Sequence, residues 1–396
     1  MKRSIGDVAD FIRGITFKPE DKVMVGSPGS VVCMRTKNIQ KDLDVSDLLA
    51  VPERFVRSQA KMLSEGDILV SSANSWDLVG KCCYVHSLGF DATAGGFISI
   101  VRAKTGTFPR FLYLWLNTPR MQHDARHCGR QTTNISNLDV DRYLALPFPD
   151  ISYDEQRRIA AILDKADAIR RKRQQALALA DAFLRSAFLE MFGDPATNPN
   201  GFDQVELQTL CLQIVDCLHK TPQHSEVVTP FPSLRTSDLQ GGYIDLSTTK
   251  YVDEAGYLER IGRLKPLPGD IVYSREGERF GIAALIPLGM TPCLGQRTMM
   301  FRVDQTKATP EFFWAMLNSR GVYRQAERLL GGATSPHVNI GDIRKFKVFR
   351  PSLNLQQRFS GMVERHFARR AHLRTFALEA DTLFASLSQR AFRGEL

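Results

Sequence analysis

Several features that mark large classes of proteins are missing from this sequence of 396 residues. No apolar run approaches the roughly 20 residues that a membrane-spanning helix needs. The first residues contain no apolar core of a secretion signal. The seven cysteines are scattered and include no C-x-x-C pair. Cys211, Cys217 and His219 come nearest to a metal-ligand set, but a fourth ligand is lacking. We therefore expect a cytoplasmic protein without disulfides or a zinc site.

Motifs of catalytic sites are missing as well. There is no G-x-x-x-x-G-K-[ST] loop to bind phosphates. There is also no Asn-Pro-Pro-aromatic or Asp-Pro-Pro-Tyr tetrapeptide of the amino-methyltransferases; the pairs Asp194-Pro195 and Asn198-Pro199 lack the second proline, and we interpret them as a linker. Asp270 and Glu276 could be nuclease carboxylates, but a charged turn at a strand entry is the simpler interpretation. We expect no catalytic residue, no metal and no cofactor.

What the sequence does contain is an internal repeat. The segment Gly66–Ser71 recurs as Gly269–Ser274, and the aromatic segment Pro109–Asn117 recurs as Pro310–Asn318, at offsets of 203 and 201 residues. Later matches keep nearly the same offset, up to the spacing of Phe183 and Gly193, which returns in Phe384 and Gly394. Between the matched points the two copies differ strongly. We infer a duplication in which both copies share a scaffold and differ in content.

The sequence of each copy predicts an α+β domain followed by one long helix. Short β-branched runs at 22–25, 96–101 and 299–303 predict strands, and proline opens one predicted helix per domain, at about 109–120 and 310–325. Gly66-Asp67 and Gly269-Asp270 are interpreted as turns before a strand. The predicted division is a first domain at 1–151, a first long helix at 152–193, a linker at 194–202, a second domain at 203–352 and a second long helix at 353–396.

The two long helices need a partner, because a lone helix of 40 residues would expose an apolar stripe about 60 Å long. The repeat copy is the simplest partner, so we predict an antiparallel coiled coil with pseudo-twofold symmetry and one domain at each end. The predicted seam of the first helix runs through Ile159, Ile162, Ala166, Ile169, Ala176, Ala180, Phe183 and Ala187. The residues predicted to bind partners along both helices are Ile162, Ile169, Phe183, Phe367, Leu373 and Phe384.

A net charge of +9 and a pI of about 9.2 favour a polyanionic partner such as nucleic acid. Two unlike domains held apart by a stiff helix pair would read a bipartite, asymmetric site. Arginine can form two hydrogen bonds to guanine, and asparagine or glutamine can form two to adenine. The candidate DNA contacts are Arg35, Lys37, Asn38, Ser72, Asn74, Lys81, Arg130, Gln131, Thr132 and Asn134 in the first domain and Arg235, Arg275, Arg279, Gln296, Arg297, Thr334, Ser335 and His337 in the second. The basic run 170–173 would contact spacer DNA or an acidic partner, or form a solvated helix face.

Four segments carry a resemblance that covers nearly the whole chain: Gly66–Ser71, Glu155–Asp164, Met191–Pro195 and Ala391–Leu396. In their duplicated order they resemble the specificity subunit of Type I restriction–modification systems. The resemblance implies that each domain reads one half of a split double-stranded DNA target. It also implies that the helices set the spacing and bind two methyltransferase subunits, through which restriction subunits join. One departure is Gln356, which stands where the first copy has Glu155.

Other functions remain open from the residues alone. The chain could be a DNA-binding regulator that works without partner subunits, or a non-catalytic coiled-coil adaptor. A nuclease or methyltransferase fused to a recognition domain is a further class, although the two copies already use the full length. The DNA sequence that would be recognised cannot be derived, because base readout depends on loop geometry and DNA shape.

Overall fold

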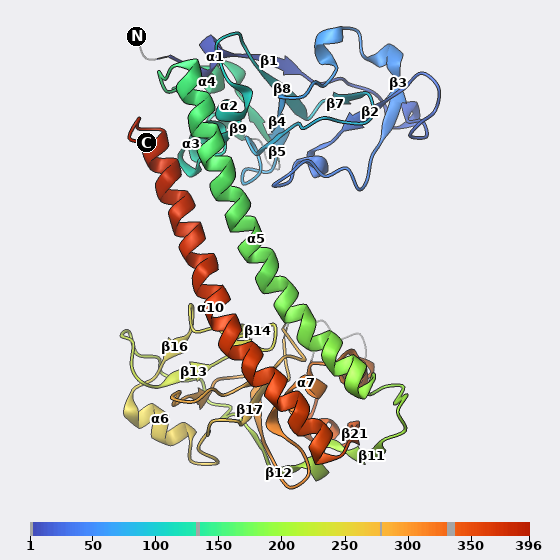
Figure 1. Cartoon of the computed structure of the whole chain (residues 1–396), viewed down its shortest axis with the longest axis vertical. Helices are drawn as coiled ribbons and strands as arrows, with labels where there is room; N and C mark the ends of the chain where they lie inside the picture. Colours follow the sequence, from blue (N-terminus) through green and yellow to red (C-terminus); the bar gives the residue numbers. More distant parts are fainter. Residues whose placement is uncertain (1–2, 132–134, 278, 331–336) are drawn as a thin grey trace. The chain divides into compact units, whose positions relative to one another are not determined.

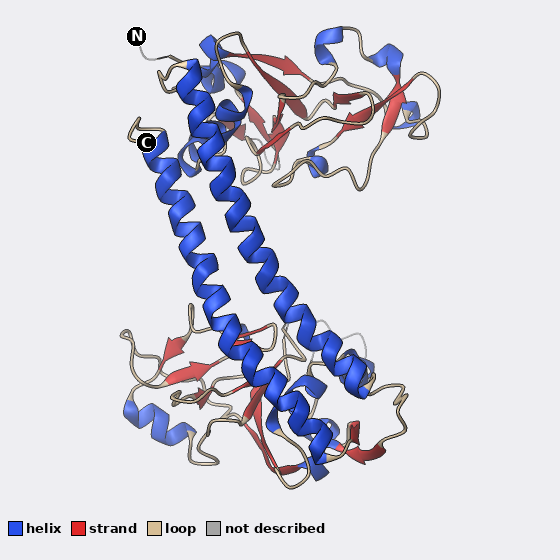
Figure 2. Cartoon of the chain, in the orientation of Figure 1, coloured by secondary structure: helices blue, strands red, loops and turns tan. Residues whose placement is uncertain are grey.

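A computed structural model of the chain describes residues 3–131, 135–277, 279–330 and 337–396. The chain forms two compact units, Met1–Arg173 with Ala377–Leu396, and Gln174–Phe376 (Figure 1). Each unit contains one α+β domain and a part of each long helix (Figure 2). We call them unit 1 and unit 2.

Unit 1 is built on a four-stranded antiparallel sheet of largely buried strands. Its core is formed where Ile68 and Val70 of this sheet meet Phe111 and the start of a long helix. The strands in sheet order are β1 (Ala9–Arg13), β8 (Ile98–Ala103), β4 (Ile68–Ser71) and β6 (Cys82–Tyr84). Two smaller sheets are β3 (Ala50–Pro52), β2 (Ser30–Met34) and β7 (Ala92–Ala94), and β5 (Ala73–Asn74), β10 (Ser136–Leu138) and β9 (Gly129–Gln131). The helices of this domain are α1 (Ile5–Val8), α2 (Pro109–Leu116), α3 (Pro119–His127) and α4 (Val140–Leu144).

Unit 2 repeats the four-stranded sheet and one three-stranded sheet of unit 1. Its four-stranded sheet has the order β12 (Cys211–Asp216), β20 (Thr298–Val303), β17 (Ile271–Ser274) and β18 (Ala283–Leu285). The three-stranded sheet again pairs its middle strand antiparallel on one side and parallel on the other: β16 (Lys250–Tyr251), β13 (Pro232–Leu234) and β19 (Cys293–Leu294). The remaining elements are β11 (Asp203–Glu206), β14 (Leu239–Gln240), β15 (Tyr243–Ile244), β21 (Lys347–Arg350), α6 (Glu254–Arg260), α7 (Pro310–Leu317), α8 (Arg320–Leu329) and α9 (Ile340–Arg344).

The repeated Gly-Asp turns have the predicted backbone and a further role. Gly66 and Gly269 have φ values of +94° and +86°, which favour glycine. The carboxylate of Asp67 is buried and 2.7 Å from the guanidinium of Arg102. Asp270 makes the same 2.7 Å ion pair with Arg302. These aspartates therefore fix the sheet in both units, which agrees with a structural rather than a nuclease role for Asp270.

Two local predictions were wrong. The single helices predicted at about 109–120 and 310–325 are each two helices, because Thr118 and Ser319 interrupt them and cap the second member. Each hydroxyl accepts a hydrogen bond from a backbone N–H of the following helix, Thr118 from Met121 and Ser319 from Val322. The segment 22–25 is a loop that touches β3 only through one bridge, between Val23 and Ala50.

The long helices are close to their predicted bounds: α5 spans Tyr153–Phe192 and α10 spans Leu353–Ala391. Gly193 and Gly394 follow them with φ values of +79° and +72°, as expected for helix-ending glycines. Fully buried glutamines fix both helix starts and are counterparts of each other, so Gln356 corresponds to Gln156 and its alignment with Glu155 was wrong. Gln156 accepts a hydrogen bond from the N–H of Phe108, and Gln356 accepts one from the N–H of Thr309, at 2.8 and 2.9 Å.

Within each unit, the first part of one long helix packs beside the last part of the other, so the two run antiparallel there. Leu163 of α5 and Phe384 of α10 belong to the core of unit 1. Phe188 of α5 and Phe359 of α10 belong to the core of unit 2.

The predicted seam is only partly buried. Ile159 and Ala187 are buried, but Ile169 and Phe183 are 51% and 55% exposed. The neighbouring stripe through Leu163, Leu184 and Phe188 is buried instead, because the globular domains cover it.

Candidate nucleic-acid interface

Neighbouring strands of the main sheet run in opposite directions, so four loops meet at one edge of each unit. In unit 1, β1 and β4 end at this edge, and β8 and β6 begin there. We call the four side chains at these strand ends, Arg13, Phe97, Ser72 and Lys81, the loop edge of unit 1. The loop edge of unit 2 contains the equivalent residues Asp216, Arg297, Arg275 and Ile282.

Three of the four side chains in the loop edge of unit 1, Arg13, Ser72 and Lys81, are polar. Arg13, which the sequence analysis missed, is exposed. Lys81 is half-buried, and its Nζ donates to Oε1 of Gln40 at 2.9 Å. Asn74 continues the surface through β5, and its amide donates to the hydroxyl of Ser71 at 3.1 Å. The edge combines cations with side chains that can form hydrogen bonds to base edges.

The three-stranded sheet beside this edge carries Arg130, which is exposed and ion-paired to Asp139, with Nε donating at 2.8 Å. Gln131 ends β9. Thr132 and Asn134 lie outside the described residues, as do Thr334 and Ser335 of the second predicted turn. Contact with DNA remains a prediction at all six of these polar positions, of which Arg130 alone has a described side chain.

Arg275 of unit 2 is not free to contact DNA, contrary to the prediction. Its side chain is buried, at 3% exposure for the residue. It donates to both carboxylate oxygens of Asp216, at 3.0 and 3.2 Å, and also pairs with Glu276 at 2.8 Å. Glu276 in turn lies 3.0 Å from Nδ1 of the exposed His337. The buried guanidinium therefore holds two carboxylates, one of which positions His337 at the surface.

Other predicted contacts of unit 2 do reach the surface. Arg297 is exposed and has a φ of +66°, which is unusual for a residue with a side chain. Gln296 is half-buried and donates to the hydroxyl of Thr221 at 2.9 Å. Arg279 is exposed, and its guanidinium donates to the carbonyl of Ser237 at 3.1 Å.

The residues after β2 and β13 that were predicted to contact DNA instead stabilise the loops to which they belong. Asn38 is only 1% exposed and donates its amide hydrogens to the carbonyls of Asp44 and Asp47, so its selection as a DNA contact was wrong. Arg35 and Lys37 both pair with Asp47.

The equivalent loop of unit 2 is held in a similar way. Arg235 pairs with the buried Asp238 and donates to the carbonyl of Thr248 at 2.7 Å. Sequence alone does not distinguish a side chain that stabilises its own loop from one that contacts DNA, because arginine and asparagine are common in both roles.

Arg13, Phe97 and Asp216 were missed by sequence reasoning. A usable signal existed, because Arg13 and Asp216 are 203 residues apart and Phe97 and Arg297 are 200 apart. Both pairs therefore occupy equivalent places in the two copies but differ in side chain. Divergent positions next to matched strands therefore point to the candidate interface.

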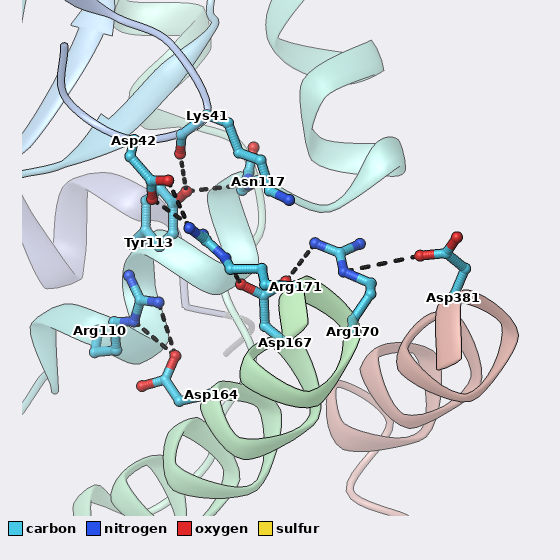
Figure 3. A network of polar contacts seen from close by, with 10 residues as sticks. All are labelled: Lys41, Asp42, Arg110, Tyr113, Asn117, Asp164, Asp167, Arg170, Arg171 and Asp381. Atoms are coloured by element: carbon cyan, nitrogen blue, oxygen red, sulfur yellow. Dashed lines mark hydrogen bonds and ion pairs between the residues drawn. The ribbon is translucent and has the colours of Figure 1, made fainter. Parts of the chain in front are cut away.

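Two arginines of the basic run 170–173 make contacts within unit 1, whereas Lys172 is exposed, so contact of the run with DNA or an acidic partner stays a prediction. Figure 3 shows that Arg171 joins the domain of unit 1 to the helix by pairing with Asp42 and with Asp167. The hydrogen bond from Arg171 lowers the pKa of Asp42 below its usual value. Arg170 pairs with Asp167, reaches Asp381 of α10 at 3.9 Å and lies over the ring of Phe384. These two arginines tie α5 to its domain and to α10 within unit 1.

Unit 2 contains the equivalent ties. Asp181 of α5 accepts from Arg370 of α10 at 2.7 and 3.2 Å, the counterpart of the pair between Asp381 and Arg170. Asp245, the counterpart of Asp42, pairs with Arg374 of α10 at 3.0 Å. Arg370 also lies over the ring of Tyr243, 3.5 Å from its centroid. The duplicated chain thus places the same chemistry between domain and helix in both units.

Each unit also has a groove beside its long helices. The groove of unit 1, of about 680 Å³, lies between the α2–α3 turn and the helices, and Leu163, Phe384 and Phe392 supply apolar lining. That of unit 2, of about 460 Å³, contains Leu184, Phe188 and Trp314. The helices expose further apolar side chains, which are Ile169, Leu378 and Leu383 in unit 1 and Leu179, Phe183 and Leu189 in unit 2.

Three further observations concern sites of other kinds. In the part of the chain that the structure describes, no three His, Cys, Asp or Glu side chains are arranged to hold a metal ion. None of the described helices is both long enough and apolar enough to cross a bilayer. The seven cysteines are unlinked, including Cys211 and Cys217.

Comparison with solved structures identifies the fold. It is the fold of the S, or specificity, subunits of Type I restriction–modification systems. The S subunit from M. genitalium superposes with a TM-score of 0.59 at 14% identity, over 99% of this chain and 96% of the other. A chain from a study of complex assembly and conformational transition in the type I R-M system gives 0.51 at 15%, over 100% and 98%. At the level of sequence, no family model and no curated protein matches this chain.

Proposed function

We propose that this chain is the DNA-specificity subunit of a Type I restriction–modification complex and is itself non-catalytic. The observation that carries the proposal is the likeness to an S subunit over 99% of the chain. The two loop edges add support, because they are equivalent in position and unlike in chemistry, as two readers of one asymmetric target would be. The net charge of +9 favours the phosphate backbone as partner.

The proposed DNA contacts differ from the sequence-based set in a few residues. Asn38 and Arg275 leave it because they are buried, and Arg35, Lys37 and Arg235 become loop-holding residues. Arg13 and Phe97 join it. The proposed set is Arg13, Ser72, Asn74, Lys81, Phe97, Arg130, Gln131, Thr132 and Asn134 in unit 1, and Arg279, Gln296, Arg297, Thr334, Ser335 and His337 in unit 2.

The proposed partners are two methyltransferase subunits, through which restriction subunits join. The long helices and their grooves would bind the methyltransferase subunits, because exposed apolar side chains such as Ile169 and Phe183 cost free energy in water and favour a protein partner. Phe367 and Phe384, which were predicted as partner contacts, are half-buried and pack within their own units, and Ile162 and Leu373 are half-buried too. We therefore assign the main partner contacts to the exposed set.

The test is to express the chain with the methyltransferase subunits of its own system and to map methylated adenines at base resolution. The proposal expects one bipartite motif with a fixed spacer, and no motif when the chain is omitted. Arg297→Ala should relax or change only the half-site read by unit 2, and Arg130→Ala only the half-site read by unit 1.

Each outcome of this experiment decides something. A motif that is continuous, or that persists without the chain, would contradict the proposal. A chain that binds DNA but fails to copurify with methyltransferase subunits would instead be a regulator. If Arg297→Ala and Arg130→Ala weakened both half-sites equally, the assignment of one reader to each half would be wrong.

A further inference from the structure

The tip of the β7–β8 turn in unit 1 presents a phenylalanine to solvent in the middle of polar residues. Phe97 is 62% exposed. Its carbonyl accepts hydrogen bonds from the N–H groups of Ser72 and Ala73, at 2.9 and 3.2 Å. Within the loop edge, Phe97 therefore lies between Arg13 on one side and Ser72 and Lys81 on the other.

The backbone of this turn is held firmly. The N–H of Gly95 donates to the carbonyl of Met34 at 2.9 Å, and a Cβ at Gly95 would lie 3.0 Å from that oxygen. A Cβ at Gly14 would lie only 2.2 Å from the carbonyl oxygen of Gly95. Three segments of unit 1 thus pack backbone against backbone beneath Phe97. The backbone that carries Phe97 is therefore already in place, and on contact only its side chain has to be ordered.

The same turn of unit 2 carries arginine instead. The N–H of Gly295 donates to the carbonyl of Leu234 at 2.8 Å, which reproduces the bond between Gly95 and Met34. The carbonyl of Arg297 accepts from the N–H of Arg275, as that of Phe97 accepts from Ser72. Phe97 and Arg297 are therefore the same position in two copies, with opposite chemistry.

Resting on the proposed function, we propose that Phe97 contacts the 5-methyl group of a thymine in the half-site read by unit 1. In the major groove each base pair offers hydrogen-bonding groups, and thymine alone adds a methyl group, which apolar side chains contact. Ser72, Asn74 and Lys81 end in polar groups, which suit the hydrogen-bonding groups of a base rather than its methyl group. Phe97 supplies the apolar surface that they lack. At the equivalent place Arg297 suits the acceptors of guanine, so the two half-sites differ at this position.

The experiment uses the complex of this chain with its methyltransferase subunits and duplexes of the mapped target. Each thymine in the half-site of unit 1 is replaced in turn by deoxyuridine, which removes one methyl group and keeps the hydrogen-bonding groups. One replacement should weaken binding about fourfold, which is the effect of one buried methyl group. With Phe97→Ala the penalty at that thymine should vanish. Phe90→Ala, which removes a part-exposed phenylalanine from another loop of unit 1, should keep it.

The possible results distinguish a failure of the inference about Phe97 from a failure of the proposed function. If no target is methylated and no duplex is bound, the proposed function fails. If a target is found but its first half-site contains no thymine, or no deoxyuridine weakens binding, the inference about Phe97 fails alone. A penalty that persists in Phe97→Ala would also overturn it. If Phe97→Ala lowers binding to thymine and deoxyuridine duplexes by the same factor, Phe97 acts by inserting between bases, and the methyl contact is refuted.

Discussion

The buried ion pair of unit 2 gives a prediction whose magnitude can be worked from the structure. Asp181 accepts two hydrogen bonds from Arg370 and one from the hydroxyl of Tyr243, at 3.0 Å. Asp181→Asn would leave the largely buried guanidinium of Arg370 without its counter-charge. Breaking a buried pair costs about 3–5 kcal/mol. Because the Asp181 side chain is 24% exposed, screening reduces the cost, and we expect about 2 kcal/mol.

The assay is thermal unfolding of the complete chain, followed by circular dichroism. A loss of about 2 kcal/mol should lower the midpoint by about 4–8 °C for a unit of this size. The matched control is Asp381→Asn in unit 1. Asp381 is 44% exposed and 3.9 Å from Arg170, so this exposed pair should contribute about 0.5 kcal/mol. A shift for Asp181→Asn no larger than that for Asp381→Asn would refute the reasoning from burial.

Three further predictions follow from the same contacts. Gln156→Ala and Gln356→Ala should each cost about 2 kcal/mol in urea unfolding, because each removes a fully buried amide and leaves the part-buried backbone N–H of Phe108 or Thr309 without its acceptor; unequal costs would contradict the structural equivalence. Burial lowers the pKa of His366, so the unfolded chain binds its proton more readily, and stability should fall as the pH drops below about 6.5. His366→Gln should reduce the stability difference between pH 7.5 and about 5.5, and an unchanged difference would exclude His366 as one of its sources. Gly193→Ala should destabilise by more than about 1 kcal/mol, because its φ is +79° and the new Cβ would lie 2.3 Å from Pro199 Cγ; a neutral effect on the melting midpoint would contradict this geometry.

The duplication and the long helices were predictable because they depend on features repeated along the chain. The Gly66-Asp67 and Gly269-Asp270 turns, the proline starts of α2 and α7, and the glycines after α5 and α10 are local signals with local physical causes. The two copies differ in sequence between these points, which likewise indicated one shared scaffold that carries different surface residues in each copy. The fold class follows from such signals without any knowledge of distant contacts.

The candidate interface was only partly predictable, because residue type does not tell whether a polar side chain faces solvent or closes its own loop. Asn38 and Arg275 have the chemistry of DNA contacts, yet Asp44, Asp47 and Asp216 satisfy them inside the protein. Their partners lie as many as 59 residues away, as Asp216 does from Arg275. No periodicity or spacing reports such a contact.

The sequence by itself therefore determined that the chain is doubled, that each copy is α+β, and that a long helix follows each domain. Only the tertiary structure decided which loops meet at one edge, because strand order in an antiparallel sheet brings together segments far apart in the chain. The tertiary structure places Arg13 and Phe97 beside Ser72. It also determines which face of α5 is buried, and that face does not include Ile169 and Phe183. Burial is a property of the packed molecule, since the same apolar side chain is covered or exposed according to what packs against it.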